Sequence, residues 1–148
     1  LIATLLPPAN PRFFLLAICA SLLTACPYPV YKKLRPEGVA LILDSTGKPI
    51  AGAKVVILTR AYPTPIHEYD VKITDENGLA SFASRRELQT ETVFLHGSIE
   101  YYWNWCVEKS GYKTYETGFS NGDEFIEHLK LTLIEGDSTS CTPIEQAN

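Results

Sequence analysis

The segment from Ile99 to Glu108 alternates more regularly than any other part of this sequence. Its odd positions are apolar or aromatic: Ile99, Tyr101, Trp103, Trp105 and Val107. Its even positions are mostly polar: Glu100, Tyr102, Asn104, Cys106 and Glu108. A period of two puts successive side chains on opposite faces of a β-strand. We therefore expect a strand whose odd face is buried and whose even face is wet.

The rest of the chain after residue 37 also favours strands, because no stretch sustains a helical period for three turns. Further strands are expected at 38–43, 54–59, 69–74, 79–82, 112–115 and 129–133. The 54–59 run is apolar on both faces, which is typical of a central strand covered on both sides. In 69–74, the side chains of Tyr69, Val71 and Ile73 are expected to be buried. The fold class predicted is all-β, an antiparallel β-sandwich of about seven strands.

Turn residues separate these strands. Asp44 to Pro49 closes the first strand, and Asn77-Gly78 is the strongest hairpin signal, with 79–82 as the return strand. Ser110-Gly111 is expected to turn the chain into 112–115. Single helical turns are expected within 85–89 and 123–128.

The front of the chain resembles an export signal. An eleven-residue apolar block, Phe13 to Leu23, follows Arg12. A membrane-spanning helix needs about 20 apolar residues, so this block is too short to span and is expected to be removed after export.

Leu23, Thr24, Ala25 and Cys26 follow directly and resemble the lipobox of bacterial lipoproteins. That resemblance implies cleavage before Cys26 and acylation of its thiol and new amino group. Several acyl chains anchor a protein stably where one chain holds only reversibly. The alternative is a buried cysteine at the end of an ordinary hydrophobic helix.

The predicted organisation is a signal peptide at 1–25, a lipidated cysteine and proline-rich tether at 26–37, a β-sandwich at 38–135 and a tail at 136–148. Of the 148 residues, 123 remain after cleavage, which suits one domain. Removing Arg12 leaves 12 of the 13 basic residues against 17 acidic ones. An acidic surface of this kind gives nucleic-acid binding little electrostatic support.

Three stretches together resemble the carboxypeptidase regulatory-like, transthyretin-like β-sandwich domains. They are 44–55, then 74–79 with Phe82, then 107–114, and they occur in the order found in that family. The resemblance implies a scaffold used in secreted and envelope proteins as an accessory, adhesive or carrier module. Fold alone grants no activity.

The cysteines left after export and lipidation are Cys106 and Cys141, and an exported address makes a disulfide between them plausible. Such a bond would strap the tail across the outer face of the sheet. The alternatives are two free thiols, or a reactive Cys106 or Cys141 with His96 as base.

No cofactor, metal or catalytic group is predicted. His67, His96 and His128 are too scattered for a zinc signature, and His67 is expected to be a partly buried structural residue. Hydroxyisourate hydrolases use this scaffold, but their C-terminal Tyr-Arg-Gly-Ser signature is missing from the tail. We therefore expect a protein that is not an enzyme.

Tyr102 is the candidate interaction residue, because it belongs to an aromatic-rich segment yet lies on the wet face of its strand. The leading hypothesis is a lipid-anchored, non-catalytic envelope module, facing the periplasm or the cell surface, that binds an unidentified envelope protein or a glycan. One alternative is a small hydrolase whose cleft gathers His67, His96 or His128 with Arg60, Arg85 or Arg86. Another is an inhibitor or immunity-type lipoprotein, in which the loop from Thr90 to Ile99 should protrude.

Overall fold

The computed structural model describes residues 28–91 and 98–141. The predicted signal peptide and Leu23, Thr24, Ala25 and Cys26 lie outside these ranges. His96, most of the 90–99 loop and the end of the tail lie outside them too. The described residues divide into two compact units, one of residues 28–30, 89–91 and 98, the other of residues 31–88 and 99–141. In the smaller unit, the hydroxyl of Tyr28 donates a hydrogen bond to Glu91 Oε2 at 3.3 Å.

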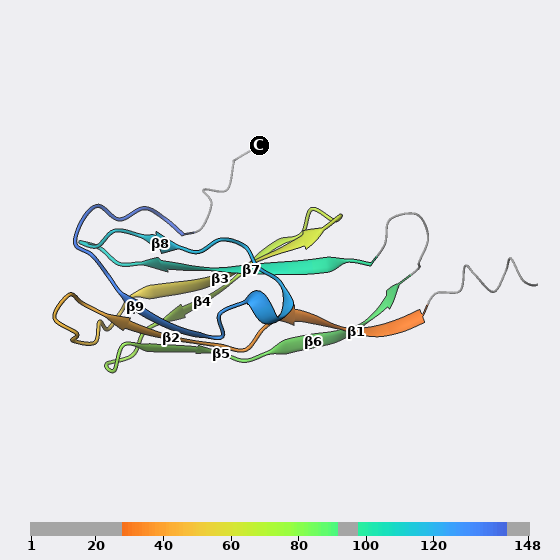
Figure 1. The fold of residues 1–148 in the computed structure, drawn as a ribbon, viewed down its shortest axis with the longest axis horizontal. Helices are drawn as coiled ribbons and strands as arrows, with labels where there is room; N and C mark the ends of the chain where they lie inside the picture. The colour runs from red at the N-terminus through yellow and green to blue at the C-terminus, as the bar shows by residue number, and fades with distance from the viewer. Residues whose placement is uncertain (1–27, 92–97, 142–148) are drawn as a thin grey trace, which may run out of the picture. The chain divides into compact units, whose positions relative to one another are not determined.

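The larger unit is a sandwich of two sheets (Figure 1). One sheet has the order β5-β2-β9 and is built from Leu79–Phe82, Gly38–Leu43 and His128–Thr132. The other has the order β4-β3-β7-β8 and is built from His67–Ile73, Lys54–Tyr62, Glu100–Glu108 and Tyr115–Glu116. These seven strands confirm the predicted β-sandwich. All pairings within the two sheets are antiparallel except β2 with β9, which is parallel.

The core lies between the facing sides of the two sheets. Ala40, Ile42, Phe82 and Leu129 of the three-stranded sheet pack there with Val55, Ile57, Trp103, Trp105 and Val107 of the other. The predicted central strand is β3, whose Val55, Val56 and Ile57 are all fully buried. The odd face of β7 is buried as predicted, at Tyr101, Trp103 and Trp105. The even face is not wet throughout as expected, because Asn104 and Cys106 are each only 1% exposed.

Two aspartates shape the main turns. Asp44 Oδ1 accepts hydrogen bonds from the backbone N–H groups of Thr46 (2.8 Å) and Lys48 (2.9 Å). Asp75 Oδ1 binds those of Asn77 and Leu79 in the same way, each at 2.9 Å. These side chains replace water at backbone groups that the turns leave without a ladder partner.

The predicted Asn77-Gly78 turn is present, but its two flanking strands do not form a hairpin. Gly78 has φ 72°, and a Cβ there would lie 2.5 Å from the carbonyl oxygen of Ile42. The strand before this turn, β4, pairs with β3, whereas the strand after it, β5, pairs with β2. The turn therefore carries the chain from one sheet of the sandwich to the other.

Two elements differ from the sequence-based expectation. The segment expected to be a tether contains β1, Tyr28–Arg35, and the expected helical turn at 85–89 lies in a strand, β6, Arg85–Glu91. These two strands pair in a two-stranded sheet. Near the second expected helical turn, a 3-10 helix, η1, spans Gly122–Glu124.

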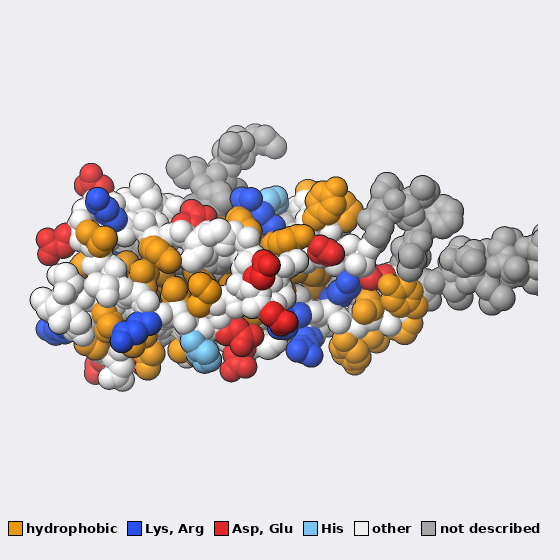
Figure 2. All heavy atoms as spheres, viewed as in Figure 1, with side chains coloured by type: hydrophobic (Ala, Val, Ile, Leu, Met, Phe, Trp, Pro, Cys, Tyr) orange, Lys and Arg blue, Asp and Glu red, His pale blue; other side chains and the backbone are white. Residues whose placement is uncertain are grey.

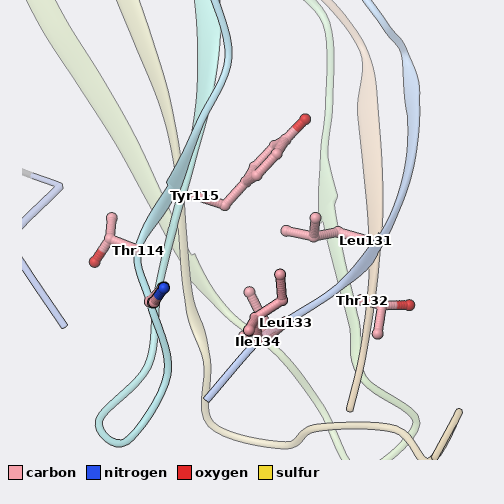
Figure 3. Close-up of a pocket in the computed structure, with 7 residues that line it drawn as sticks. Thr114, Tyr115, Leu131, Thr132, Leu133 and Ile134 are labelled. Atoms are coloured by element: carbon pink, nitrogen blue, oxygen red, sulfur yellow. The ribbon is translucent and has the colours of Figure 1, made fainter. Parts of the chain in front are cut away.

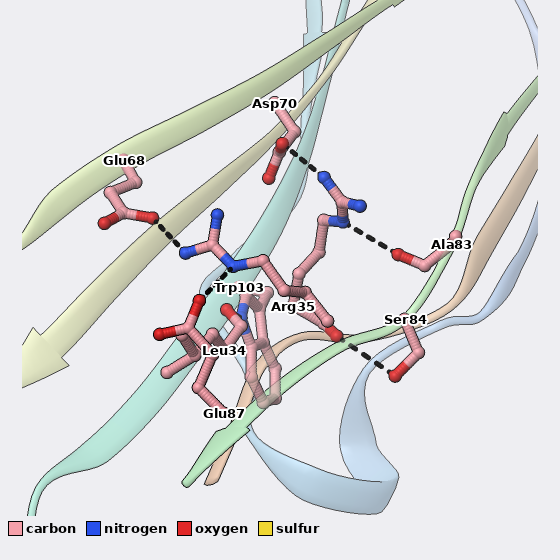
Figure 4. A network of polar contacts seen from close by, with 9 residues as sticks. Leu34, Arg35, Glu68, Asp70, Ala83, Ser84, Glu87 and Trp103 are labelled. Atoms are coloured by element: carbon pink, nitrogen blue, oxygen red, sulfur yellow. Dashed lines mark hydrogen bonds and ion pairs between the residues drawn. The ribbon is translucent and has the colours of Figure 1, made fainter. Parts of the chain in front are cut away.

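A polar network within the larger unit ties β1 and β6 to β4 (Figure 4). Arg35 forms an ion pair with Asp70 and donates a hydrogen bond from Nε to the carbonyl oxygen of Ala83 at 2.9 Å. Arg85 forms a second ion pair, with Glu68, at 2.8 Å. The even side of β4 is thus occupied by charge pairs instead of apolar packing.

The expected facing of β4 is therefore wrong. Tyr69 is 49% exposed, Val71 43% and Ile73 59%, because the odd side chains of β4 lie on the outer face of the sheet. His67 is exposed for the same reason and is not the partly buried residue that was expected.

Candidate interaction surface

Tyr102 lies on the outer face of β7, on the side opposite the core. The backbone alternates there, so the neighbouring Tyr101 and Trp103 are buried while Tyr102 remains partly exposed. Its hydroxyl donates a 2.8 Å hydrogen bond to Glu100 Oε2. This hydrogen bond, with the negative charge of Glu100, raises the pKa of Tyr102. Tyr102 is therefore held protonated, with its ring at the surface and its hydroxyl oriented.

Arg60 is the cross-strand neighbour of Tyr102 on β3. Its guanidinium carbon lies 4.1 Å from the centre of the Phe119 ring, the arrangement of a cation–π contact. Arg60 is also opposite His67 on β4, so one row crosses three strands as His67, Arg60 and Tyr102. The name outer-face row is used below for these three residues together with Glu100 and Phe119.

The outer-face row combines the chemical groups common in recognition surfaces. Tyrosine and arginine are enriched at binding hot spots, because each offers a broad apolar face together with hydrogen-bond donors. Contact with Phe119 restrains the Arg60 side chain, which reduces the entropy lost on binding. Sequence analysis found Tyr102 through its parity. Arg60 was named from the sequence only for a hydrolase cleft and not beside Tyr102, and Phe119 was missed, since no local pattern marks it.

The other aromatic residues near Tyr102 in the sequence serve the core. Trp103 Nε1 donates to the carbonyl oxygen of Leu34 at 2.9 Å, and Trp105 Nε1 donates to that of Ile126 at 2.7 Å. Both indole N–H groups therefore have a backbone acceptor although the rings are buried. Tyr112 and Tyr115 are partly buried against the core.

The predicted disulfide between Cys106 and Cys141 is present, with the two Cα atoms 5.6 Å apart. It places the C-terminal segment on the outer face of β7, where both cysteines pack with Val56 and partly buried Leu58. Glu108 Oε2 accepts a hydrogen bond from the backbone N–H of Cys141 at 2.9 Å and is bound by Lys54 Nζ at 3.3 Å. The strap thus covers the outer face around Val56 and Leu58, whereas His67 and Arg60 are exposed and Tyr102 is partly exposed.

Of the histidines and arginines named for a hydrolase cleft, the structure brings together His67 and Arg60, as cross-strand neighbours on the outer face. His67 is exposed on β4 and His128 is exposed on β9, in the other sheet. Arg60 is opposite His67 but lies over Phe119, and Arg85 is engaged by Glu68. Within residues 28–91 and 98–141, no group of three or more His, Cys, Asp or Glu side chains is placed to hold a metal ion.

The described surface of the larger unit includes the following two hollows. One, of about 220 Å³, lies beside β8 and β9, with Tyr115, Leu131 and Leu133 directed into it (Figure 3). No carboxylate, imidazole or thiol lines it. The second, of about 260 Å³, lies beside Trp105 and Phe125 and includes Glu124.

Charge and membrane features complete the surface. On the face drawn in Figure 2, acidic and basic side chains are interspersed and no single-sign block is seen. None of the described residues forms a helix with the length and apolar character needed to cross a membrane.

Comparison of the chain with protein-family models, with curated proteins and with solved structures gave no significant match.

Proposed function

We propose that this chain is a lipid-anchored, non-catalytic module of the bacterial cell envelope, and that its outer-face row binds an envelope protein or a glycan. The anchor rests on the sequence from Leu23 to Cys26, which resembles a lipobox. The observation that carries the binding role is the arrangement of Tyr102 beside Arg60 on adjacent strands, with Glu100 and Phe119 holding the two side chains.

This arrangement suits a flat ligand surface more than a small substrate. A tyrosine ring offers an apolar platform on which a sugar ring or a partner's aliphatic side chain packs. The Arg60 guanidinium supplies several donors in a plane, and Glu100 supplies an acceptor. Because both Tyr102 and Arg60 have partners within the protein, little reorganisation is required before binding.

The binding role is tested by replacing Tyr102 with a photo-crosslinking phenylalanine analogue in the full chain, expressed in a bacterium. The matched position is Tyr31, which is 73% exposed on β1. We expect one defined envelope adduct, either to a protein or to cell-wall glycan, from position 102 and none of the same identity from position 31. In a binding assay with that identified partner, Tyr102→Ala should weaken binding about tenfold or more, and Tyr31→Ala should not.

The result that would overturn this role is a folded Tyr102→Ala protein that keeps every partner of the wild type with unchanged affinity. Identical adducts from both positions would do the same, since they would report proximity and not a specific surface.

The anchor is tested separately, by intact mass and membrane partitioning of the wild-type chain beside Cys26→Ala. The wild type should lose residues 1–25, gain the mass of acyl chains and sediment with membranes, and the variant should do none of these. If both proteins behave alike, the lipid anchor is wrong, although the surface around Tyr102 could still bind its partner.

A further inference from the structure

The edge strand β4 has an uncommon combination of length and exposure. Of the four strands that end the two sheets of the larger unit, β4 has seven residues, whereas β5, β8 and β9 have four, two and five. All residues of β4 except Asp70 are exposed. Edge strands are usually kept short or covered, because their unpaired backbone groups invite another strand.

The backbone of β4 directs one set of hydrogen-bonding groups away from the sheet. Thr74 N–H donates to Ala53 (2.9 Å) and Ala61 N–H donates to Ile66 (3.2 Å), which places the even residues of this strand in hydrogen-bonded pairs with β3. The N–H and C=O groups of Tyr69 and Val71 therefore point to the outer edge.

We propose that β4 pairs antiparallel with β4 of a second copy of this chain, about a two-fold axis at Asp70. In that register Tyr69 is opposite the second copy's Val71, and Glu68 is opposite the second copy's Lys72. Each pair occurs twice, as an isologous interface requires. The Tyr69–Val71 pairs form on the outer face and the Glu68–Lys72 pairs on the inner one, and both kinds of cross-strand pair are favourable. This inference does not depend on the function proposed above.

On the axis, Asp70 of one copy lies opposite Asp70 of the other. The repulsion between these two carboxylates is offset by a neighbouring positive charge in each copy. Arg35 forms an ion pair with Asp70, so each copy brings a guanidinium beside its carboxylate. Glu68 is bound by Arg85 through Oε2, and a carboxylate accepts several hydrogen bonds, so it retains capacity for the second copy's Lys72. The network in Figure 4 thus orders the charged side of β4 before association.

The apolar side of β4 gives the reason for association. Tyr69, Val71 and Ile73 expose between 43% and 59% of their surfaces in the single chain. Pairing two copies makes one eight-stranded sheet across the axis and places Tyr69 of each copy beside Val71 of the other, while Ile73 lies opposite the second copy's His67. A seam of seven residues is short compared with stable interfaces, so the association is expected to depend on protein concentration.

The first test compares the purified full chain with two arginine variants by sedimentation velocity, all in the same detergent. Val71→Arg places a charge in the seam, and Ile126→Arg places one on a similarly exposed apolar residue, 51% exposed, outside the seam. We expect the wild type and Ile126→Arg to shift from monomer to dimer as concentration rises, and Val71→Arg to remain monomeric with an unchanged melting temperature. A monomeric wild type at all concentrations, or a dimeric Val71→Arg, would overturn the proposal.

The second test examines the charge pairs without altering the apolar side. Lys72→Glu leaves two acidic residues at the paired positions of one chain, and Glu68→Lys leaves two basic residues in the other. Each variant alone should dimerise at least tenfold more weakly than the wild type. A mixture of the two should form the heterodimer, because opposite charges then meet at both pairs. If the mixture stays monomeric while the wild type dimerises, the register at Asp70 is wrong.

Discussion

Gly38, at the start of β2, lies against the indole ring of Trp105. A Cβ at Gly38 would be 2.8 Å from both Cζ2 and Cη2 of that ring. The ring has little freedom to move, because its Nε1 is bound to the carbonyl oxygen of Ile126. Phe82 contacts it edge-on at 5.6 Å between centroids, and Phe125 stacks on it at 5.4 Å. The absence of a side chain at Gly38 is thus what allows Trp105 to fill the core.

Gly38→Ala is expected to lower the free energy of unfolding by about 1–3 kcal/mol, the usual cost of overpacking a core. Urea unfolding followed by tryptophan fluorescence measures it. Gly118→Ala is the control, because nothing lies within 4 Å of a Cβ at that position, and its effect should stay within about 0.5 kcal/mol. Equal losses in the two variants would show that Gly38 acts through backbone flexibility and not through contact with Trp105.

The disulfide between Cys106 and Cys141 closes a loop with a sequence separation of 35. In the chain-entropy model, a loop of that length restricts the unfolded chain enough to add about 4 kcal/mol of stability. Cys141→Ser should lose most of this, and a reductant should destabilise the wild type but not the variant. The measurement is the free energy of unfolding of both proteins in denaturant, with and without reductant. A wild-type protein indifferent to reductant would contradict a bonded pair.

Arg35 and Asp70 should be energetically coupled, because the ion pair lies where their side chains are only 19% and 27% exposed. A double-mutant cycle with Arg35→Gln and Asp70→Asn is expected to give a coupling free energy of about 1 kcal/mol or more. The comparison cycle uses Arg85→Gln and Glu68→Gln, whose side chains are 39% and 50% exposed, and should give a smaller value. A larger coupling in the second cycle would contradict this ranking.

Local patterns predicted most strands of the sandwich, but β8 is Tyr115–Glu116 and not the expected 112–115. The bounds of β2 and β5 match the expected 38–43 and 79–82, because turn residues flank both runs and their side chains alternate. The strands β1 and β6 were missed. One carries proline and the other is mostly charged or polar, so neither contains the apolar alternation that marks a half-buried strand.

The strand β4 shows that alternation alone does not determine which face of a strand meets the core. A period of two separates Tyr69 and Val71 from Glu68 and Asp70, but it does not say which set meets the core. Here the charged set turns inward because Arg35 and Arg85 come from distant segments of the chain to pair with it. In the outer-face row, Tyr102 was predictable from parity, whereas Arg60 and Phe119 meet only through strand register and a return loop.

Glu108 should make the stability of the protein depend on pH in the acid range. The backbone N–H of Cys141 donates to its carboxylate and Lys54 adds a charge, so the pKa of Glu108 is lowered from its ordinary value of 4.5. A pKa lowered by folding stabilises the folded state fully above the unfolded pKa, and that contribution is lost as the pH falls through the folded pKa. Glu108→Gln removes the titrating group, so its deficit relative to the wild type should be constant from neutral pH to about pH 5 and should shrink below pH 4.5. Unfolding by urea at a series of pH values measures both proteins. Two stability curves that stay parallel down to about pH 2 would show that the carboxylate does not hold the C-terminal strap by its charge.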